Sequence, residues 1–97
     1  MSDLYFRNSR VRSQSTKAGM LLFHLSTGKA YQCNETAEVL WRSLDDHPTL
    51  GDLVAHFRHL FPEVLEETLT HDVERVLRLY ESEHLVRRME DPRGMQG

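Results

Sequence analysis

The hydrophobic pattern of the first third of the chain is that of short strands. Residues 4–13 mix polar side chains with scattered apolar ones, which predicts a weak strand, and the polar residues 13–18 predict a turn. Residues 19–25 are rich in strand formers, and strict alternation places Leu21, Phe23 and Leu25 on one face. This segment is the strongest strand prediction in the sequence.

A second strand is expected soon after the first. Residues 26–29 form a short turn in which Gly28 can adopt a positive φ, and Ala30–Cys33 then returns as a short strand. The two segments together predict an antiparallel hairpin.

From Asn34 onward the apolar residues recur at helical spacing. Asn34 is a good N-cap, and the first helix is expected to end at residues 45–48. Thr49 and Asp52 have the spacing of a capping box, so a second helix begins there and ends before Pro62. The longest helix is predicted over residues 63–83, with an unusually wide apolar arc of about 160°.

These elements predict an α+β domain of the winged-helix-turn-helix type, in which a three-stranded antiparallel sheet is followed by three helices. Residues 85–88 are expected to form a terminal strand or an extended exit from the last helix. We therefore predict one domain over residues 1–88 and a disordered tail over residues 89–97.

Composition narrows the possible functions. The chain has 97 residues, 39% of them hydrophobic and 28% charged, which suits a small binding module better than an enzyme with an enclosed active site. A single cysteine rules out an internal disulfide framework. No signal peptide or membrane-spanning run is recognisable, so a cytoplasmic location is expected.

The net charge of −3 conceals two regions of opposite sign. Residues 1–30 carry five basic side chains against one acidic side chain, whereas residues 62–84 carry seven acidic against two basic ones. An acidic long helix repels phosphate, which disfavours the alternative that this is a winged-helix regulator binding DNA. The basic N-terminal strands keep that alternative open.

No catalytic or metal-binding constellation is recognisable. His56 and His59 share one helix face and would need a third ligand to hold a metal ion, so solvated surface histidines are favoured. Cys33 has no readable base beside it and is interpreted as a small strand residue. Trp41 is interpreted as a core aromatic, and Asp45 and Asp46 as a solvated pair that ends the first helix.

Two groups of residues at characteristic separations resemble a known family. The first group comprises Gly28, Tyr31, Asn34, Thr36, Ala37 and Trp41. The second group comprises Asp72, Val73, Val76, Leu77, Tyr80, Leu85 and Val86. Over residues 10–88 this order resembles the PqqD-like family, also called the RiPP recognition element, where RiPP denotes a ribosomally made, post-translationally modified peptide. Cys33 replaces the usual leucine, and His47 and His84 replace the usual glycines.

The resemblance implies a non-catalytic, cofactor-free chaperone that binds the leader segment of a precursor peptide. In this family the leader adds as a strand beside the third strand and lies against the third helix, a recognised mode of peptide binding. The residues we expect to contact it are Lys29, Ala30, Tyr31, Gln32, Cys33, Thr68, Asp72, Arg75, Val76 and Leu79. No metal site is expected.

The resemblance also indicates the partners. These are the precursor peptide and a modifying enzyme such as a radical SAM enzyme or a leader peptidase. Neither nucleic acid nor membrane is expected, because the long helix is acidic and no membrane-spanning run is present. The chain is expected to be a monomer or weak homodimer. The pathway stays open between quinone cofactor biosynthesis and another peptide pathway, such as that of a lasso peptide.

Overall fold

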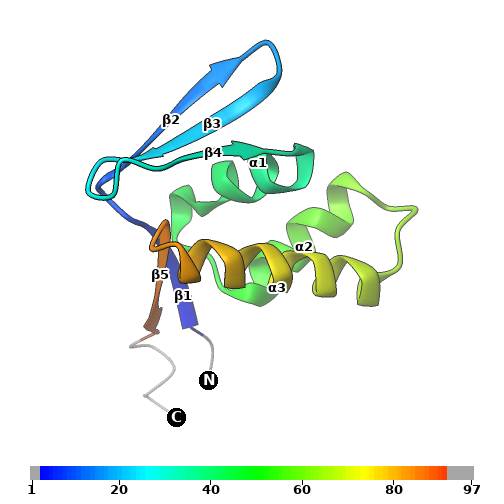
Figure 1. Cartoon of the computed structure of the whole chain (residues 1–97). Helices are drawn as coiled ribbons and strands as arrows, with labels where there is room; N and C mark the ends of the chain where they lie inside the picture. The colour runs from blue at the N-terminus through cyan, green and yellow to red at the C-terminus, as the bar shows by residue number, and fades with distance from the viewer. Residues whose placement is uncertain (1–2, 92–97) are drawn as a thin grey trace.

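The computed structural model describes residues 3–91, which form two small antiparallel sheets and three α-helices (Figure 1). In chain order the elements are β1 (Asp3–Arg7), β2 (Val11–Thr16), β3 (Gly19–His24), β4 (Ala30–Cys33), α1 (Glu35–Arg42), the short 3₁₀ helix η1 (Ser43–Asp46), α2 (Leu50–Leu60), α3 (Glu66–Ser82) and β5 (Val86–Glu90). The predicted α+β class is confirmed, with three helices after a three-stranded sheet of order β2-β3-β4.

The boundaries of the first strands differ from the prediction. The single weak strand expected at residues 4–13 is two strands, β1 and β2, separated by a turn in which the Asn8 side chain accepts a hydrogen bond from the Arg10 N–H at 2.9 Å. The turn predicted at residues 13–18 is present but shorter, because β2 continues to Thr16 and only residues 17 and 18 form the turn. Pairing with β3 explains this extension, since a neighbouring strand stabilises polar residues that have little intrinsic strand preference.

Leu21, Phe23 and Leu25 do share a face, but it is the outer face of the sheet. Met20 and Leu22 on the opposite face are buried beneath α1, whereas 49% of the Leu25 surface is exposed. Alternation shows which residues share a face and leaves open which face packs on the core. Figure 1 shows the β2–β3 hairpin projecting beyond the helices, while β3 and β4 both contact α1.

Both predicted caps are present. The Asn34 side chain accepts a hydrogen bond from the Ala37 N–H at 2.9 Å and begins α1. Thr49 and Asp52 form the reciprocal capping box that begins α2. The long helix α3 begins at Glu66, later than predicted, because the preceding residue Leu65 has an extended backbone.

The terminal strand β5 pairs antiparallel with β1 and brings the two ends of the described chain together. It continues through Met89 and Glu90, which the sequence analysis placed in a disordered tail, and Asp91 after it is buried. The rest of that predicted tail, residues 92–97, lies outside the described residues. None of the described helices is long and apolar enough to cross a membrane.

Two histidines occupy left-handed backbone positions where the family resemblance expects glycine. His47 ends η1 with φ 52°, and His84 follows α3 with φ 59°. A side chain disfavours this conformation, and glycine does not, so the backbone explains why glycine is usual at both places. At His47 a side-chain contact offsets the backbone strain, because the His47 ring stacks on Phe6 with 4.1 Å between the ring centroids.

We expect His84→Gly to raise the free energy of unfolding by about 0.5–1 kcal/mol, because glycine relieves the left-handed strain. His47→Gly should give no such gain, since it also removes an aromatic contact worth about 0.5–1.5 kcal/mol. Urea unfolding of both variants beside His84→Ala measures the difference. Equal stabilisation by both glycine substitutions would contradict this explanation.

Candidate functional site

β4 is an edge strand with one unpaired side. It pairs only with β3 among the strands that residues 3–91 contain. The His24 N–H donates to the Lys29 carbonyl at 2.9 Å, which sets the alternation of the antiparallel ladder. Tyr31 and Cys33 consequently direct their backbone groups toward β3, whereas Ala30 and Gln32 direct their N–H and C=O groups away from the sheet.

The inward side chains of β4 fasten the strand to the C-terminal turns of α3. The Tyr31 hydroxyl donates a hydrogen bond to Glu83 Oε1 at 2.6 Å, and Lys29 Nζ lies 3.8 Å from the same oxygen. One turn earlier, Cys33 Sγ lies 3.7 Å from the Tyr80 hydroxyl. The free edge of β4 is therefore held beside α3 at a fixed height along the helix.

These contacts shift the pKa values of their members. The hydrogen bond to Glu83 raises the pKa of Tyr31 to about 12 and, with the nearby Lys29, lowers the pKa of the Glu83 carboxyl. The contact thus stabilises the fold at pH values above the ordinary carboxyl pKa and is lost as the pH falls through the lowered value. Burial raises the pKa of the Cys33 thiol, which disfavours the nucleophilic thiolate form.

The predicted contact residues of α3 lie on the same flank of the helix as Glu83. At 100° per residue, Asp72, Val76, Leu79 and Glu83 follow one another along a single row. Leu79, in the last turn of α3, is 56% exposed although it is a leucine. An exposed leucine on the flank nearest a free strand edge is a suitable contact for an apolar side chain of a ligand.

The other two predicted α3 residues, Thr68 and Arg75, lie to one side of this row. Thr68 and Arg75, with Asp72, line a hollow of about 260 Å³ that His71 and Arg78 complete. Arg75 Nη2 lies 3.4 Å from Asp72 Oδ1, so its charge is partly compensated within the helix. Thr68 precedes Tyr80 by roughly 18 Å of helix axis, a length that about five or six residues of extended peptide cover.

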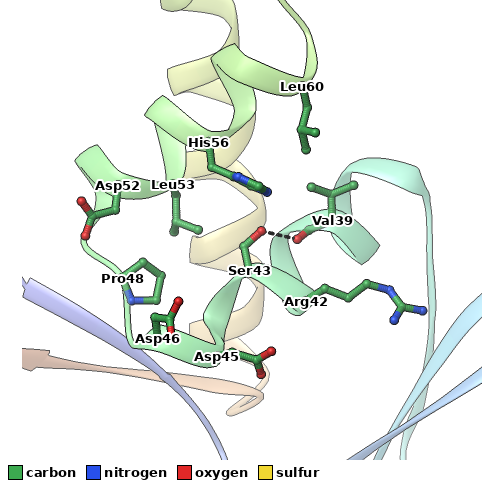
Figure 2. A pocket seen from close by; sticks show the side chains of 10 residues that line it. All are labelled: Val39, Arg42, Ser43, Asp45, Asp46, Pro48, Asp52, Leu53, His56 and Leu60. Carbon is green, nitrogen blue, oxygen red and sulfur yellow. Dashed lines mark hydrogen bonds between the residues drawn. The ribbon is translucent and has the colours of Figure 1, made fainter.

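A larger pocket than this hollow lies elsewhere, between α1 and α2 (Figure 2). It has a volume of about 650 Å³, and three of its polar side chains are engaged within the fold. Asp45 pairs with Arg7, Asp52 accepts from the Thr49 N–H at 3.1 Å, and the Ser43 hydroxyl donates to the Val39 carbonyl at 2.7 Å. These bonds leave few polar groups to orient a ligand.

The histidine pair weighed as a metal site lines two different hollows. His56 lines the pocket between α1 and α2, and His59 lines a different hollow near Pro62. Within residues 3–91, no three side chains of the metal-binding types gather at one place.

The sequence analysis missed Glu83, which joins β4 to α3. The sequence could have indicated Glu83, because it follows Leu79 by one helical turn on the flank that carries the predicted contact residues. What the sequence did not show is that Tyr31, from a strand 52 positions earlier, reaches it.

Comparisons with known proteins agree with this geometry. The family model described as coenzyme PQQ synthesis protein D (PqqD) matches residues 19–86, more than half of the chain. No curated protein gives a significant match.

Two solved structures share the fold. One is a lasso peptide synthetase B1 complexed with its leader peptide, with a TM-score of 0.74, 19% identity, and coverage of 86% of this chain and 96% of that chain. The other is TbiB1 in complex with the TbiA(beta) leader peptide, with a TM-score of 0.75, 20% identity, and coverage of 84% and 93%.

We expect Glu83→Gln to lower the pKa of Tyr31 from about 12 toward the ordinary tyrosine value, because the amide cannot act as an anionic acceptor. Ring resonances of Tyr31 followed by NMR during an alkaline titration measure the shift, and Glu67→Gln in the first turn of α3 is the matched control. An unchanged Tyr31 titration would show that the two side chains do not meet in solution.

Proposed function

The chain belongs to the PqqD family, and from that membership we propose that it is a non-catalytic peptide chaperone. It binds the leader segment of a ribosomally made precursor peptide and presents it to a separate modifying enzyme. The observation that carries the proposal is the free edge of β4 beside the partly apolar flank of α3. Two proteins of the same fold have been solved with leader peptides, which supports this ligand class.

The leader would bind by strand addition at β4. Its backbone would pair with the outward N–H and C=O groups of Ala30 and Gln32, which fixes register without demanding a sequence. Alternate side chains of an added strand point toward the helices, where Tyr31, Val76 and Leu79 offer a half-apolar surface. Apolar residues at every second position of the leader are therefore the expected recognition pattern.

Charged side chains lie at both ends of the proposed contact surface, where they could bind polar residues at the ends of the leader. Lys29 and Glu83 lie at the start of the strand, whereas Asp72 and Arg75 lie at the other end of the contact surface. Both cations within α3, Arg75 and Arg78, pair with acidic side chains of the same helix. That pairing supports a peptide ligand over DNA, since phosphate binding needs cations that are free to release counterions.

In this role the chain needs no cofactor of its own. The chemistry belongs to the modifying enzyme, a radical SAM enzyme or a leader peptidase, and the complex forms in the cytoplasm where precursors are made. The two solved structures that share this fold and contain leader peptides favour a lasso-peptide pathway over quinone cofactor biosynthesis.

Titration of the protein with its precursor tests the proposal. We expect the leader alone to bind with the affinity of the whole precursor and the core segment alone to show no binding, as measured by isothermal calorimetry. A leader that fails to bind, both alone and with the modifying enzyme present, would refute the chaperone role. A duplex DNA that binds with steep salt dependence would favour a regulator instead.

Proline at Gln32 tests strand addition separately. We expect Gln32→Pro to weaken leader binding at least tenfold, because proline removes the outward N–H that an added strand would use, and a tenfold change is about 1.4 kcal/mol. Gln32→Ala keeps the backbone donor and is expected to bind nearly as well as the unaltered protein. Since the Gln32 N–H does not pair with β3, both variants should fold, which circular dichroism checks. Equal affinity of the two variants would argue against a main-chain contact at β4.

A further inference from the structure

The sheet has a second free edge, on β2. Within residues 3–91, β2 pairs only with β3. The Leu25 N–H donates to the Arg10 carbonyl at 2.8 Å, and this bond sets the alternation of the ladder. Ser13 and Ser15 therefore direct their backbone N–H and C=O groups outward, and both residues are exposed.

A basic hollow lies along this edge. It has a volume of about 430 Å³ and is bounded by β2, by the inner face of β3 and by the end of α1. Its lining includes three arginines, Arg7, Arg12 and Arg42, and one carboxylate, Asp45. Trp41 and Met20 supply apolar surface at its base.

The cations of this edge are only partly neutralised. Arg7 is paired with Asp45, and Arg42 lies 3.2 Å from Glu38. Arg12 donates to the Ser9 carbonyl at 2.7 Å and has no carboxylate within 4.0 Å in the described part of the chain. Further along the same hairpin, Lys17 likewise forms no ion pair with a described residue.

The surrounding sequence contains no acidic side chain. Between Asn8 and Asn34 there are four basic residues and no aspartate or glutamate. Exposed strand edges commonly carry charges that prevent unspecific pairing, and charges of one sign restrict the pairing to strands of the opposite sign. The β2 edge is thus complementary to an extended acidic segment.

We propose that the β2 edge binds an acidic, extended segment of the modifying enzyme, a site distinct from the leader edge on β4. The inference rests on the proposed function for the identity of the partner. The segment would pair with Ser13 and Ser15 through its main chain and direct alternate carboxylates toward Arg12, which lies opposite Phe23 in the ladder. Because leader and enzyme occupy opposite edges of one sheet, both bind at once, and the bound leader is held next to the enzyme.

The test uses two probe peptides, a fluorescent peptide of alternating valine and glutamate and the same peptide with lysine in place of glutamate. We expect only the acidic peptide to bind, with affinity that falls as salt rises. Arg12→Glu should weaken binding at least about tenfold, because it reverses a charge facing the segment. Ser13→Pro should abolish binding and Ser13→Ala should not, since only proline removes the outward N–H.

The same variants are then titrated with the leader and with the modifying enzyme. We expect Arg12→Glu and Ser13→Pro to bind the leader with unchanged affinity, which also shows that both variants are folded. Neither variant should bind the modifying enzyme. Gln32→Pro should show the reverse pattern, with the acidic peptide still bound. If the leader does not bind the unaltered protein while the acidic peptide does, the chaperone role falls and the β2 site stands.

Three outcomes overturn the β2 site. The first is equal binding of the acidic and the lysine peptide. The second is unchanged enzyme binding by Arg12→Glu. The third is a β2 edge that pairs with a second copy of the chain, seen as a dimer in sedimentation that Ser13→Pro disrupts.

Discussion

One buried tyrosine sets the position of the long helix against the sheet. The Tyr80 hydroxyl donates a hydrogen bond to the Ala37 carbonyl of α1 at 2.8 Å and lies 3.7 Å from Cys33 Sγ of β4. Its ring meets Trp41 edge-on, with 5.8 Å between the centroids. Burial raises the pKa of Tyr80, so the hydroxyl stays a donor at any physiological pH. Because a buried hydroxyl is costly without its partner, α3 has one favoured rotation and height relative to β4.

That constraint decides which residues of α3 are available for binding. With Tyr80 turned into the core, Leu69, Val73 and Leu77 are buried with it, and the flank of Leu79 and Glu83 faces the free strand edge. The apolar arc that looked too wide from the sequence therefore has two uses. One part of it forms the core, and the remainder stays at the surface beside β4.

Periodicity and capping predicted the helices well, because Asn34, Thr49 and Asp52 act within a few residues of where they stand. The strands were predicted less well. β1 depends on pairing with β5 at the other end of the chain, and the polar half of β2 depends on β3. The buried face of β3 was also undetermined, since Leu21 and Phe23 are as apolar as Met20 and Leu22. Of the candidate site, the free edge of β4 was predictable from the sequence. The flank of α3 beside it was not determined by the wide apolar arc, and the Tyr31–Glu83 contact that joins the two elements required the fold.

In the proposed role, the outer face of the sheet would leave a bound peptide open to the enzyme that modifies it. Half of the side chains of a strand added at β4 would face α3, and the other half would continue the outer surface that Leu21, Phe23 and Leu25 begin. The helix side would select the peptide, while the outer side would leave its remaining side chains open to a second protein. An enclosed pocket would bury both halves. In the proposed complex, a sheet with two free edges would hold one partner without hiding it from the other.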